Sequence, residues 1–327
     1  MRAFEYARPT SVDDAVRLVA ERPDAGFIAG GTDLLNLMKD GARAHDRLID
    51  VNALPLADVV ERDGVVRIGA LARMREVAEH PAVRRAAPVV SEALLNSASP
   101  QVRNMAAIGG NLLQRTRCGY FRDTGSPCNK RVPGSGCPAL EGQNRAHAIL
   151  GVSDHCIAVH PSDLAVSLLA VDATVLTQGP EGARRIPMGE FHVVPGATPD
   201  RENALEHGEL IVGVEIPITP MAATSRYLKL RDRATFEFAV VAVAAALEMN
   251  GNVVRDVRLT FGGVATKPWR SPEAEAALRG RPLTGDTIAA AGQALVRGAV
   301  TREHNAFKAD LVQRALDGHL RDLGGVQ

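Results

Sequence analysis

The sequence predicts an α+β fold. Short strand-like runs, helices and turns alternate up to about residue 216, and Pro217 and Pro220 then bracket a predicted boundary. Beyond it, two longer strand-like runs meet at a turn, and three helical stretches close the chain. With 327 residues, the chain is long enough for about two domains with cores of their own.

The N-terminal part leads into a turn suited to binding phosphate. A helix capped by Thr10 or Ser11 comes first, and a short strand at 27–29 follows. This strand leads into Gly30-Gly31-Thr32-Asp33, after which leucines at helical spacing continue until Gly41. Backbone without side chains lets a ligand approach closely, and unpaired amides can point at its phosphates.

A second segment repeats this pattern. The run 105–113 (MAAIGGNLL) again combines small apolar residues, a double glycine, a polar residue and leucines, after a helix around 89–96. Two matched turns suggest the two ends of one elongated phosphate-bearing ligand, although such glycines also serve close packing and hairpin corners. Between them, Asp63-Gly64 joins the runs 58–62 and 65–70 as a predicted hairpin.

The remaining elements are predicted from their apolar periods. Ser162 and Asp163 cap a helix at 164–170, and strands follow at 173–177, around Ile186 and Phe191, and at 210–216. The C-terminal part holds strands at 227–230, 238–249 and 257–261 and helices at 272–278, 287–296 and 304–320. One face of the last helix is predicted to pack on the core through Phe307, Leu311, Val312, Ala315, Leu316 and Leu320.

All four cysteines, Cys118, Cys128, Cys137 and Cys156, fall within one stretch of 39 residues. Their C-x9-C-x8-C-x18-C spacing lacks the C-x2-C pairs of zinc ribbons. Residues 115–147 are rich in Gly and Pro and poor in apolar residues, so they need a cross-link, such as a bound metal or disulfides, to become ordered. From the spacing alone, an iron-sulfur cluster, a zinc ion, and disulfides or free thiols are equal alternatives.

Charge argues against a general affinity for nucleic acid or anionic membranes, because 38 basic residues balance 38 acidic ones. Between residues 115 and 147, six basic residues stand against two acidic ones, a local excess that would offset an anionic cluster or form a partner-facing patch. No signal peptide is predicted at the N-terminus. The longest apolar run, 238–247, is too short to span a membrane.

Four motifs together resemble a known family. IAGGTDLL (28–35), LIDVNAL (48–54), VVRIGAL (65–71) and IGGNLL (108–113) resemble the FAD-binding subunit of molybdenum hydroxylases, the family of xanthine dehydrogenase, carbon monoxide dehydrogenase and aldehyde oxidoreductase. The resemblance implies a two-subdomain FAD-binding domain of the p-cresol methylhydroxylase/vanillyl-alcohol oxidase type over residues 1–219, with a subdomain break near residue 54. It also implies a C-terminal flavoprotein domain of small antiparallel sheet and helix bundle over 220–327. Neither a G-x-G-x-x-G fingerprint nor a Walker A loop occurs.

The cysteine segment, residues 115–157, resembles an insertion that most members of this family lack. It occurs in 4-hydroxybenzoyl-CoA reductases and in the bacterial aldehyde oxidoreductase exported to the periplasm. RTRCGYFRD, PCNKR, PGSGC and SDHC are most similar to the aldehyde enzyme. The resemblance therefore implies a 4Fe-4S cluster held by Cys118, Cys128, Cys137 and Cys156.

The resemblance also assigns residues to FAD. It places the first diphosphate loop at Ala29, Gly30, Gly31, Thr32, Asp33, Leu34 and Leu35, and the second at Ala107, Gly110, Asn111 and Leu113. Relatives often carry a serine or threonine where this chain has Ala107, so one hydroxyl is missing here. Asp163 is expected to accept hydrogen bonds from ribose or ribityl hydroxyls, Ile211 to make an apolar contact, and Lys229 to lie near the flavin ring. No catalytic residue is expected in this chain.

The expected function is electron transfer within a heterotrimer. A large molybdenum-cofactor subunit would oxidise an aldehyde, a small subunit with 2Fe-2S clusters would relay the electrons, and this chain would pass them through FAD to an external acceptor. The alternatives are a subunit of a 4-hydroxybenzoyl-CoA reductase-like enzyme and a zinc-stapled interaction or nucleic-acid-binding module. The expected location is the cytoplasm, or the periplasm by co-export with a signal-bearing partner.

Overall fold

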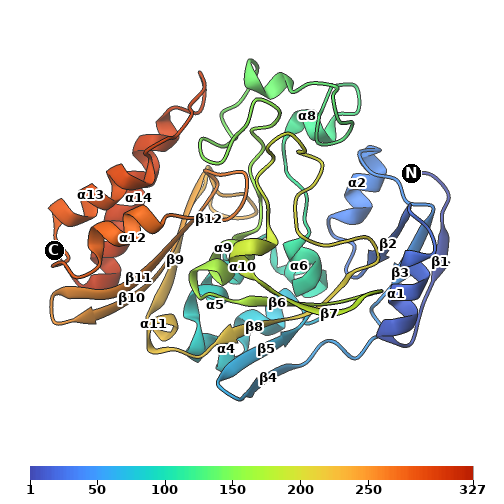
Figure 1. Cartoon of the computed structure of the whole chain (residues 1–327), viewed down its shortest axis with the longest axis horizontal. Coiled ribbons are helices and arrows are strands. Elements are labelled where there is room, and N and C mark those ends of the chain that lie inside the picture. Colours follow the sequence, from blue (N-terminus) through green and yellow to red (C-terminus); the bar gives the residue numbers. More distant parts are fainter. Residues whose placement is uncertain (327) are drawn as a thin grey trace.

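The computed structural model describes residues 1–326, which form three β-sheets with helices packed around and between them (Figure 1). This architecture confirms the predicted mixture of helices and sheets, with a sheet in the C-terminal part. Among the described residues, no helix combines the length and apolar character needed to cross a bilayer.

The N-terminal sheet is small and parallel, with the strand order β1-β3-β2. Its elements are β1 (Glu5–Ala7), α1 (Val12–Ala20), β2 (Ala25–Ile28), α2 (Leu34–Asp40) and β3 (Arg47–Asp50). As predicted, Ser11 caps α1, because its hydroxyl oxygen accepts from the Asp14 N–H. Gly41 ends α2 with a φ of 74°, a left-handed conformation that suits glycine. The predicted change from strand to helix at residues 29–33 is therefore confirmed.

The central sheet is antiparallel, with the strand order β4-β5-β8-β6-β7. Its strands are β4 (Val59–Arg62), β5 (Val65–Gly69), β6 (Thr174–Gly179), β7 (Gly182–Pro187) and β8 (Leu210–Pro217). The predicted hairpin is confirmed, since Asp63 and Gly64 join β4 to β5 with φ values of 52° and 77°. The helices that accompany this sheet are α3 (Met74–Glu79), α4 (Pro81–Ala86), α5 (Pro88–Leu95), α6 (Pro100–Met105), α7 (Ile108–Leu112), α9 (Asp163–Ala170) and α10 (Met188–Phe191).

The C-terminal part forms a four-stranded antiparallel sheet with three helices against it. The elements are α11 (Pro220–Ala223), β9 (Ser225–Leu230), β10 (Val241–Asn250), β11 (Val253–Gly262), β12 (Trp269–Arg270), α12 (Pro272–Leu278), α13 (Gly285–Leu295) and α14 (Phe307–Gly324).

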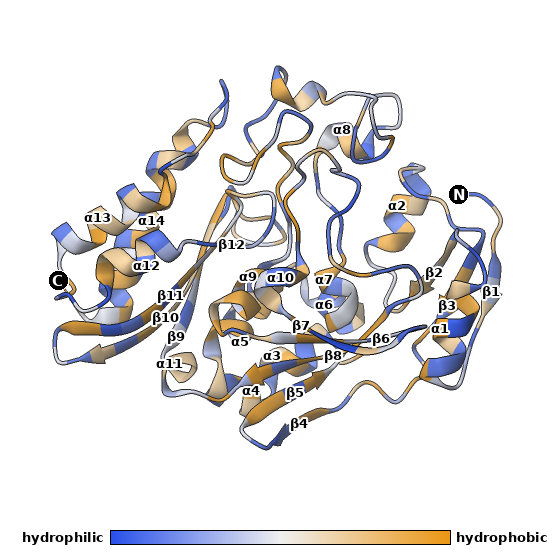
Figure 2. Cartoon of the chain, in the orientation of Figure 1, coloured by the Kyte–Doolittle hydropathy of each residue, from blue (hydrophilic) through white to orange (hydrophobic). Residues whose placement is uncertain are grey.

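Strand β10 is buried on both faces and joins the two largest cores. Val241, Val243 and Ala245 pack with α12, α13 and α14, whereas Ala242 and Ala244 belong to the core that contains α5 and α9. Figure 2 shows the hydrophobic colouring of α5 and α9 at the centre of the molecule. A strand with two buried faces needs apolar residues at every position, which explains the continuous run in the sequence.

The cysteine segment (115–157) lies between α7 and α9 in the chain. Its only helical turns among the described residues are α8 (Gly119–Arg122) and a 3-10 turn at Pro138–Leu140. In Figure 1 it forms the green loops at the top, with α8 facing α2. Arg122 and Asp40 make an ion pair of 3.6 Å across this contact. The segment thus lies beside the N-terminal sheet, although 65 residues or more separate them in sequence, counting from Asp50 to Arg115.

Four local predictions were wrong. Gly109 and Gly110 lie inside α7 rather than in a turn before it, and Phe191 ends a short helix rather than forming a strand. Phe238 precedes β10 and is 42% exposed, and Phe307 is 36% exposed at the start of α14. Arginine guanidinium groups cover both of these rings, so tertiary cation-π contacts replace core packing at the two positions.

A buried lysine in α14 generates a prediction about pH. Lys308 has no exposed side chain and donates from Nζ to the Gly263 carbonyl oxygen at 2.6 Å. Burial, assisted by the nearby Arg145, lowers its pKa to about 7. The unfolded chain, with a lysine pKa near 10.4, binds one more proton between these two values.

We expect the unfolding free energy of the wild-type chain to rise relative to Lys308→Met from about pH 7 to about pH 10, by up to about 1.4 kcal/mol per pH unit. Below pH 7 the difference should be constant, because Lys308 is then protonated in both states. Urea denaturation of the two proteins across this range checks the prediction. A pH-independent difference above pH 7 would contradict it.

Candidate functional site

The main cavity has a volume of about 970 Å³ and lies where the N-terminal sheet, α7 and the β9–β10 connection meet. Its walls include residues 29–34 of the first glycine turn (28–35) and Ala106, Ala107, Gly110, Asn111 and Leu113 of the second glycine segment (105–113). Ser97, Asp163, Lys229 and residues 236–238 line it as well. The cavity is therefore built from segments that are far apart in the sequence.

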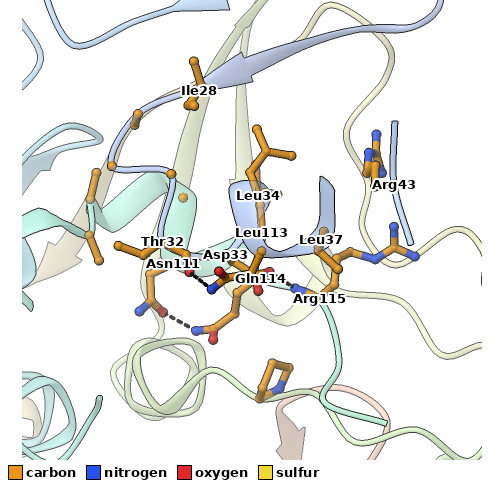
Figure 3. Close-up of a pocket in the computed structure, with 18 of the residues that line it drawn as sticks. Ile28, Thr32, Asp33, Leu34, Leu37, Arg43, Asn111, Leu113, Gln114 and Arg115 are labelled. Atoms are coloured by element: carbon orange, nitrogen blue, oxygen red, sulfur yellow. Dashed lines mark hydrogen bonds between the residues drawn. The ribbon is translucent and has the colours of Figure 1, made fainter. Parts of the chain in front are cut away.

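The first glycine turn touches the second glycine segment directly. A Cβ atom at Gly30 would overlap the Met105 carbonyl oxygen, a backbone atom that cannot move away cheaply. Gly31 has a φ of 67°, which a residue with a side chain adopts only with strain. In Figure 3, Thr32 and Asp33 of the first turn face Asn111 and Gln114. The two segments consequently border one region of the cavity.

The two glycines of α7 serve different purposes. Gly109 packs against Ala70, whose Cβ would be 3.0 Å from a side chain added at this position. Gly110 has no atom within 4 Å of such a side chain and faces the cavity. Ala107 occupies the N-cap position of α7 without a side-chain acceptor, as expected for an alanine there.

Asp163 and Lys229 form a buried ion pair of 2.7 Å. The carboxylate of Asp163 also accepts from the Tyr227 hydroxyl at 2.6 Å and from the Ser97 hydroxyl at 2.9 Å. Burial and the Asp163 charge raise the pKa of Tyr227, so this phenol stays a donor. Ser162, rather than Asp163, caps α9 through its hydroxyl. Tyr227, Ser97 and Lys229 thus all donate to the Asp163 carboxylate, which also pairs with the charge of the Lys229 ammonium.

Two of the residues assigned by resemblance do not line the main cavity. Ile211 is 3% exposed and lies beneath Gly109, while Leu35 packs against Gly31. Both side chains therefore pack against glycines of the two segments, Ile211 against Gly109 and Leu35 against Gly31. The other twelve residues assigned to FAD do line it: Ala29, Gly30, Gly31, Thr32, Asp33, Leu34, Ala107, Gly110, Asn111, Leu113, Asp163 and Lys229.

None of the arginines in the cavity wall was assigned from the sequence. Arg43, Arg115 and Arg117 line the cavity around the first glycine turn, and Figure 3 shows Arg43 and Arg115 beside α2. Burial lowers the pKa of both Arg43 and Arg117, yet an arginine keeps its charge. The basic excess of the cysteine segment was the one signal in the sequence, but it did not show that Arg115 and Arg117 face the cavity.

Asp33 connects the first glycine turn to the cysteine segment. Its carboxylate pairs with the Arg117 guanidinium, with Arg122 at 2.9 Å, and accepts from the Arg115 backbone N–H at 2.8 Å. Burial alone would raise the pKa of Asp33, but Arg117 and Arg122 outweigh it and lower the pKa. Asp33 therefore stays ionised, and its carboxylate is held by partners from the cysteine segment.

The four cysteines converge on one small pocket. Cys118, Cys128, Cys137 and Cys156 all line it, and all four are free thiols. The His147 Nε2 atom lies 3.1 Å from the Cys118 sulfur, and the Ala158 N–H donates to the Cys156 sulfur at 3.4 Å. Burial, with the charges of Cys128 and Cys156 nearby, raises the pKa of Cys118 to about 11. Within residues 1–326, no three His, Cys, Asp or Glu side chains are grouped closely enough to hold a single metal ion.

Comparison with known proteins identifies the family. Residues 2–219 match the family described as the FAD binding domain in molybdopterin dehydrogenase, which is more than half of the chain. The chain belongs to this family. Residues 226–321 of this molybdopterin dehydrogenase flavoprotein match a second family, the CO dehydrogenase flavoprotein C-terminal domain.

Relatives cover almost the whole flavoprotein. It is 48% identical to the aldehyde oxidoreductase FAD-binding subunit PaoB of Escherichia coli (strain K12), over 97% of this chain and 96% of that protein. It is 28% identical to the carbon monoxide dehydrogenase medium chain of Hydrogenophaga pseudoflava, over 90% of this chain and 86% of that one. A solved structure of carbon monoxide dehydrogenase from the same organism, lacking the Mo-pyranopterin moiety, superimposes with a TM-score of 0.76 at 27% identity, covering 97% and 96% of the two chains.

The unequal surroundings of Gly30 and Gly110 generate a prediction. Gly30→Ala should lower the unfolding free energy of the flavoprotein by about 2 kcal/mol or more, because the new methyl group overlaps backbone. Gly110→Ala, in a helix with open space around it, should leave stability unchanged or raise it by up to about 1 kcal/mol. Urea denaturation of the ligand-free variants measures both. Equal losses for the two variants would contradict the proposed contact.

Proposed function

We propose that this chain is the FAD- and 4Fe-4S-containing electron-transfer subunit of a molybdenum-dependent aldehyde oxidoreductase. The observation that carries the proposal is the convergence of all four cysteines on one pocket beside a large cavity built from two glycine segments. The 48% identity to an aldehyde oxidoreductase FAD-binding subunit supports the same assignment.

The main cavity suits FAD in size and in charge. Its volume of about 970 Å³ lies at the upper end of the range for ligand pockets, as expected for a dinucleotide. The bare backbone of Gly30, Gly31 and Gly110 admits a diphosphate, and Arg43, Arg115 and Arg117 supply positive charge around it. Asp163 and Lys229, paired with each other, also border the cavity. We propose that the flavin ring lies next to this pair.

The cysteine pocket suits a cluster better than a single ion. Four thiolates on one zinc ion, at about 2.3 Å each, must lie within roughly 4 Å of one another. The described residues form no such tight group, although all four cysteines line the same pocket. A larger inorganic core needs its four thiolate ligands farther apart than a single ion does, and Cys118, Cys128, Cys137 and Cys156 would hold it.

When bound, FAD takes up electrons singly or in pairs and a 4Fe-4S cluster passes them one at a time, so together they can link one-electron carriers to an external acceptor. The chain's own residues bind and orient these groups. We propose that a large molybdenum-cofactor subunit oxidises the aldehyde and that a small 2Fe-2S subunit delivers the electrons. The flavin domain would be of the p-cresol methylhydroxylase/vanillyl-alcohol oxidase type and span 1–219, and the assembly would lie in the cytoplasm or reach the periplasm with a signal-bearing partner.

Metal and flavin content test the proposal. The purified wild-type chain should contain about four iron atoms per FAD and little zinc, with the optical spectrum of both groups. Cys128→Ser should lose most of the iron, because one of four ligands is removed. Val132→Ser, four residues away and 56% exposed, is the matched control and should keep it.

Two results would contradict the proposal. A colourless, zinc-loaded wild-type chain would favour a zinc-stapled module instead. Full iron retention in Cys128→Ser would remove this cysteine from the ligand set and leave the cluster assignment without its basis.

A further inference from the structure

Asp33 draws all of its strong partners from the cysteine segment. The three donors come from Arg115, Arg117 and Arg122, which flank Cys118 on both sides. Asp33 precedes α2 but does not cap it with its side chain. Its carboxylate is 15% exposed, so without these donors a charge in the wall of the cavity would be left largely unpaired.

Arg117 connects three parts of the molecule through its contacts. It pairs with Asp33 of the first glycine turn, it directly precedes Cys118, and its guanidinium lies 4.9 Å from the centre of the Phe238 ring in the β9–β10 connection. It lines both the main cavity and a second cavity of about 560 Å³ that reaches Cys118 and His147. Its Nε atom is buried and has no hydrogen-bond partner among the described residues.

A second set of ion pairs also joins the cysteine segment to the cavity wall. Glu202, another residue of the cavity wall, pairs with Arg115 and, at 2.9 Å, with Lys130. The Lys130 Nζ atom also donates to the Pro199 carbonyl oxygen at 2.7 Å. Lys130 stands two residues after Cys128, so this contact also begins beside a cysteine of the pocket.

The position of these basic residues depends on the cysteine pocket. Residues 115–147 have no strand of their own and few apolar residues, so this part depends on contacts between its loops, those at the cysteines included. If the four thiolates are not held together, the three donors of Asp33 lose their fixed positions, and the first glycine turn loses the contacts that orient it.

We propose that the cysteine segment completes the FAD site, and that loading of the four-cysteine pocket raises the affinity for FAD through Asp33. This inference rests on the proposed function. By linkage, FAD must raise the affinity for the metal centre by the same factor. Asp33 acts as a positioning residue, since its carboxylate contacts the arginines.

FAD titrations of the full chain test the coupling. The proteins are the iron-loaded wild type, Cys128→Ser, Asp33→Asn and the double variant, each stripped of FAD and titrated with FAD by flavin fluorescence. The matched control is Asp172→Asn, because Asp172 also pairs with two arginines, Arg258 and Arg270, but lies outside both cavities. Circular dichroism and the unfolding midpoint report whether each variant is folded.

We expect Cys128→Ser and Asp33→Asn each to weaken FAD binding by about 5- to 150-fold, the usual range for coupled sites, and the double variant to be no weaker than the weaker single one. Asp172→Asn should bind FAD as the wild type does. Asp33→Asn keeps every cysteine, so it tests the coupling even if Cys128→Ser fails to fold.

Three results would overturn the coupling. The first is equal FAD affinity of the iron-loaded wild type and Cys128→Ser, and the second is additive losses in the double variant. The third is tighter FAD binding by Asp33→Asn, which a direct repulsion between Asp33 and the diphosphate would produce. In each case a wild-type chain that still carries iron and FAD leaves the proposed function intact. A wild-type chain that binds neither contradicts the proposed function and the coupling together.

Discussion

The partly buried carboxylate of Asp33 is the constraint on which the arrangement of the site depends. A charged side chain that is only 15% exposed is costly unless it is paired and hydrogen-bonded. Here all three donors come from the cysteine segment. The chain must therefore bring residues 115–122 against the first glycine turn. Once it does, Arg115, Arg117 and Arg122 line the cavity, and Cys118 is placed among them in the sequence.

A second constraint comes from the C-terminal sheet. Strand β10 contributes to two cores at once, so the sheet cannot move as a separate body without exposing one of them. Its neighbour β9 carries Lys229 and Tyr227 to Asp163, and the connection between the two strands carries Phe238 to Arg117. The cavity is thus closed by residues whose positions are set by packing that lies well outside it.

Local signals in the sequence predicted much of this fold. The Ser11 cap, the left-handed Gly41, the Asp63-Gly64 hairpin and the first glycine turn all depend on neighbouring residues, and all are confirmed. The errors arose where distant residues decide. Gly109 packs against Ala70, and Arg117 and Arg145 cover the Phe238 and Phe307 rings that were expected in the core. The pairing of Asp33 with Arg117 spans 84 positions, and no local pattern reveals it. The motif resemblance located the cavity residues, yet only the folded chain shows that the cysteine segment supplies part of the wall.

The central claim is that the cysteine pocket orders the first glycine turn. Hydrogen–deuterium exchange, measured on the iron-loaded and the iron-free wild-type chain, both without FAD, tests it most directly. We expect removal of iron to speed amide exchange in residues 28–35 as well as in the cysteine segment, while β10 and β11 keep their protection. Faster exchange confined to the cysteine segment, with residues 28–35 unchanged, would contradict it.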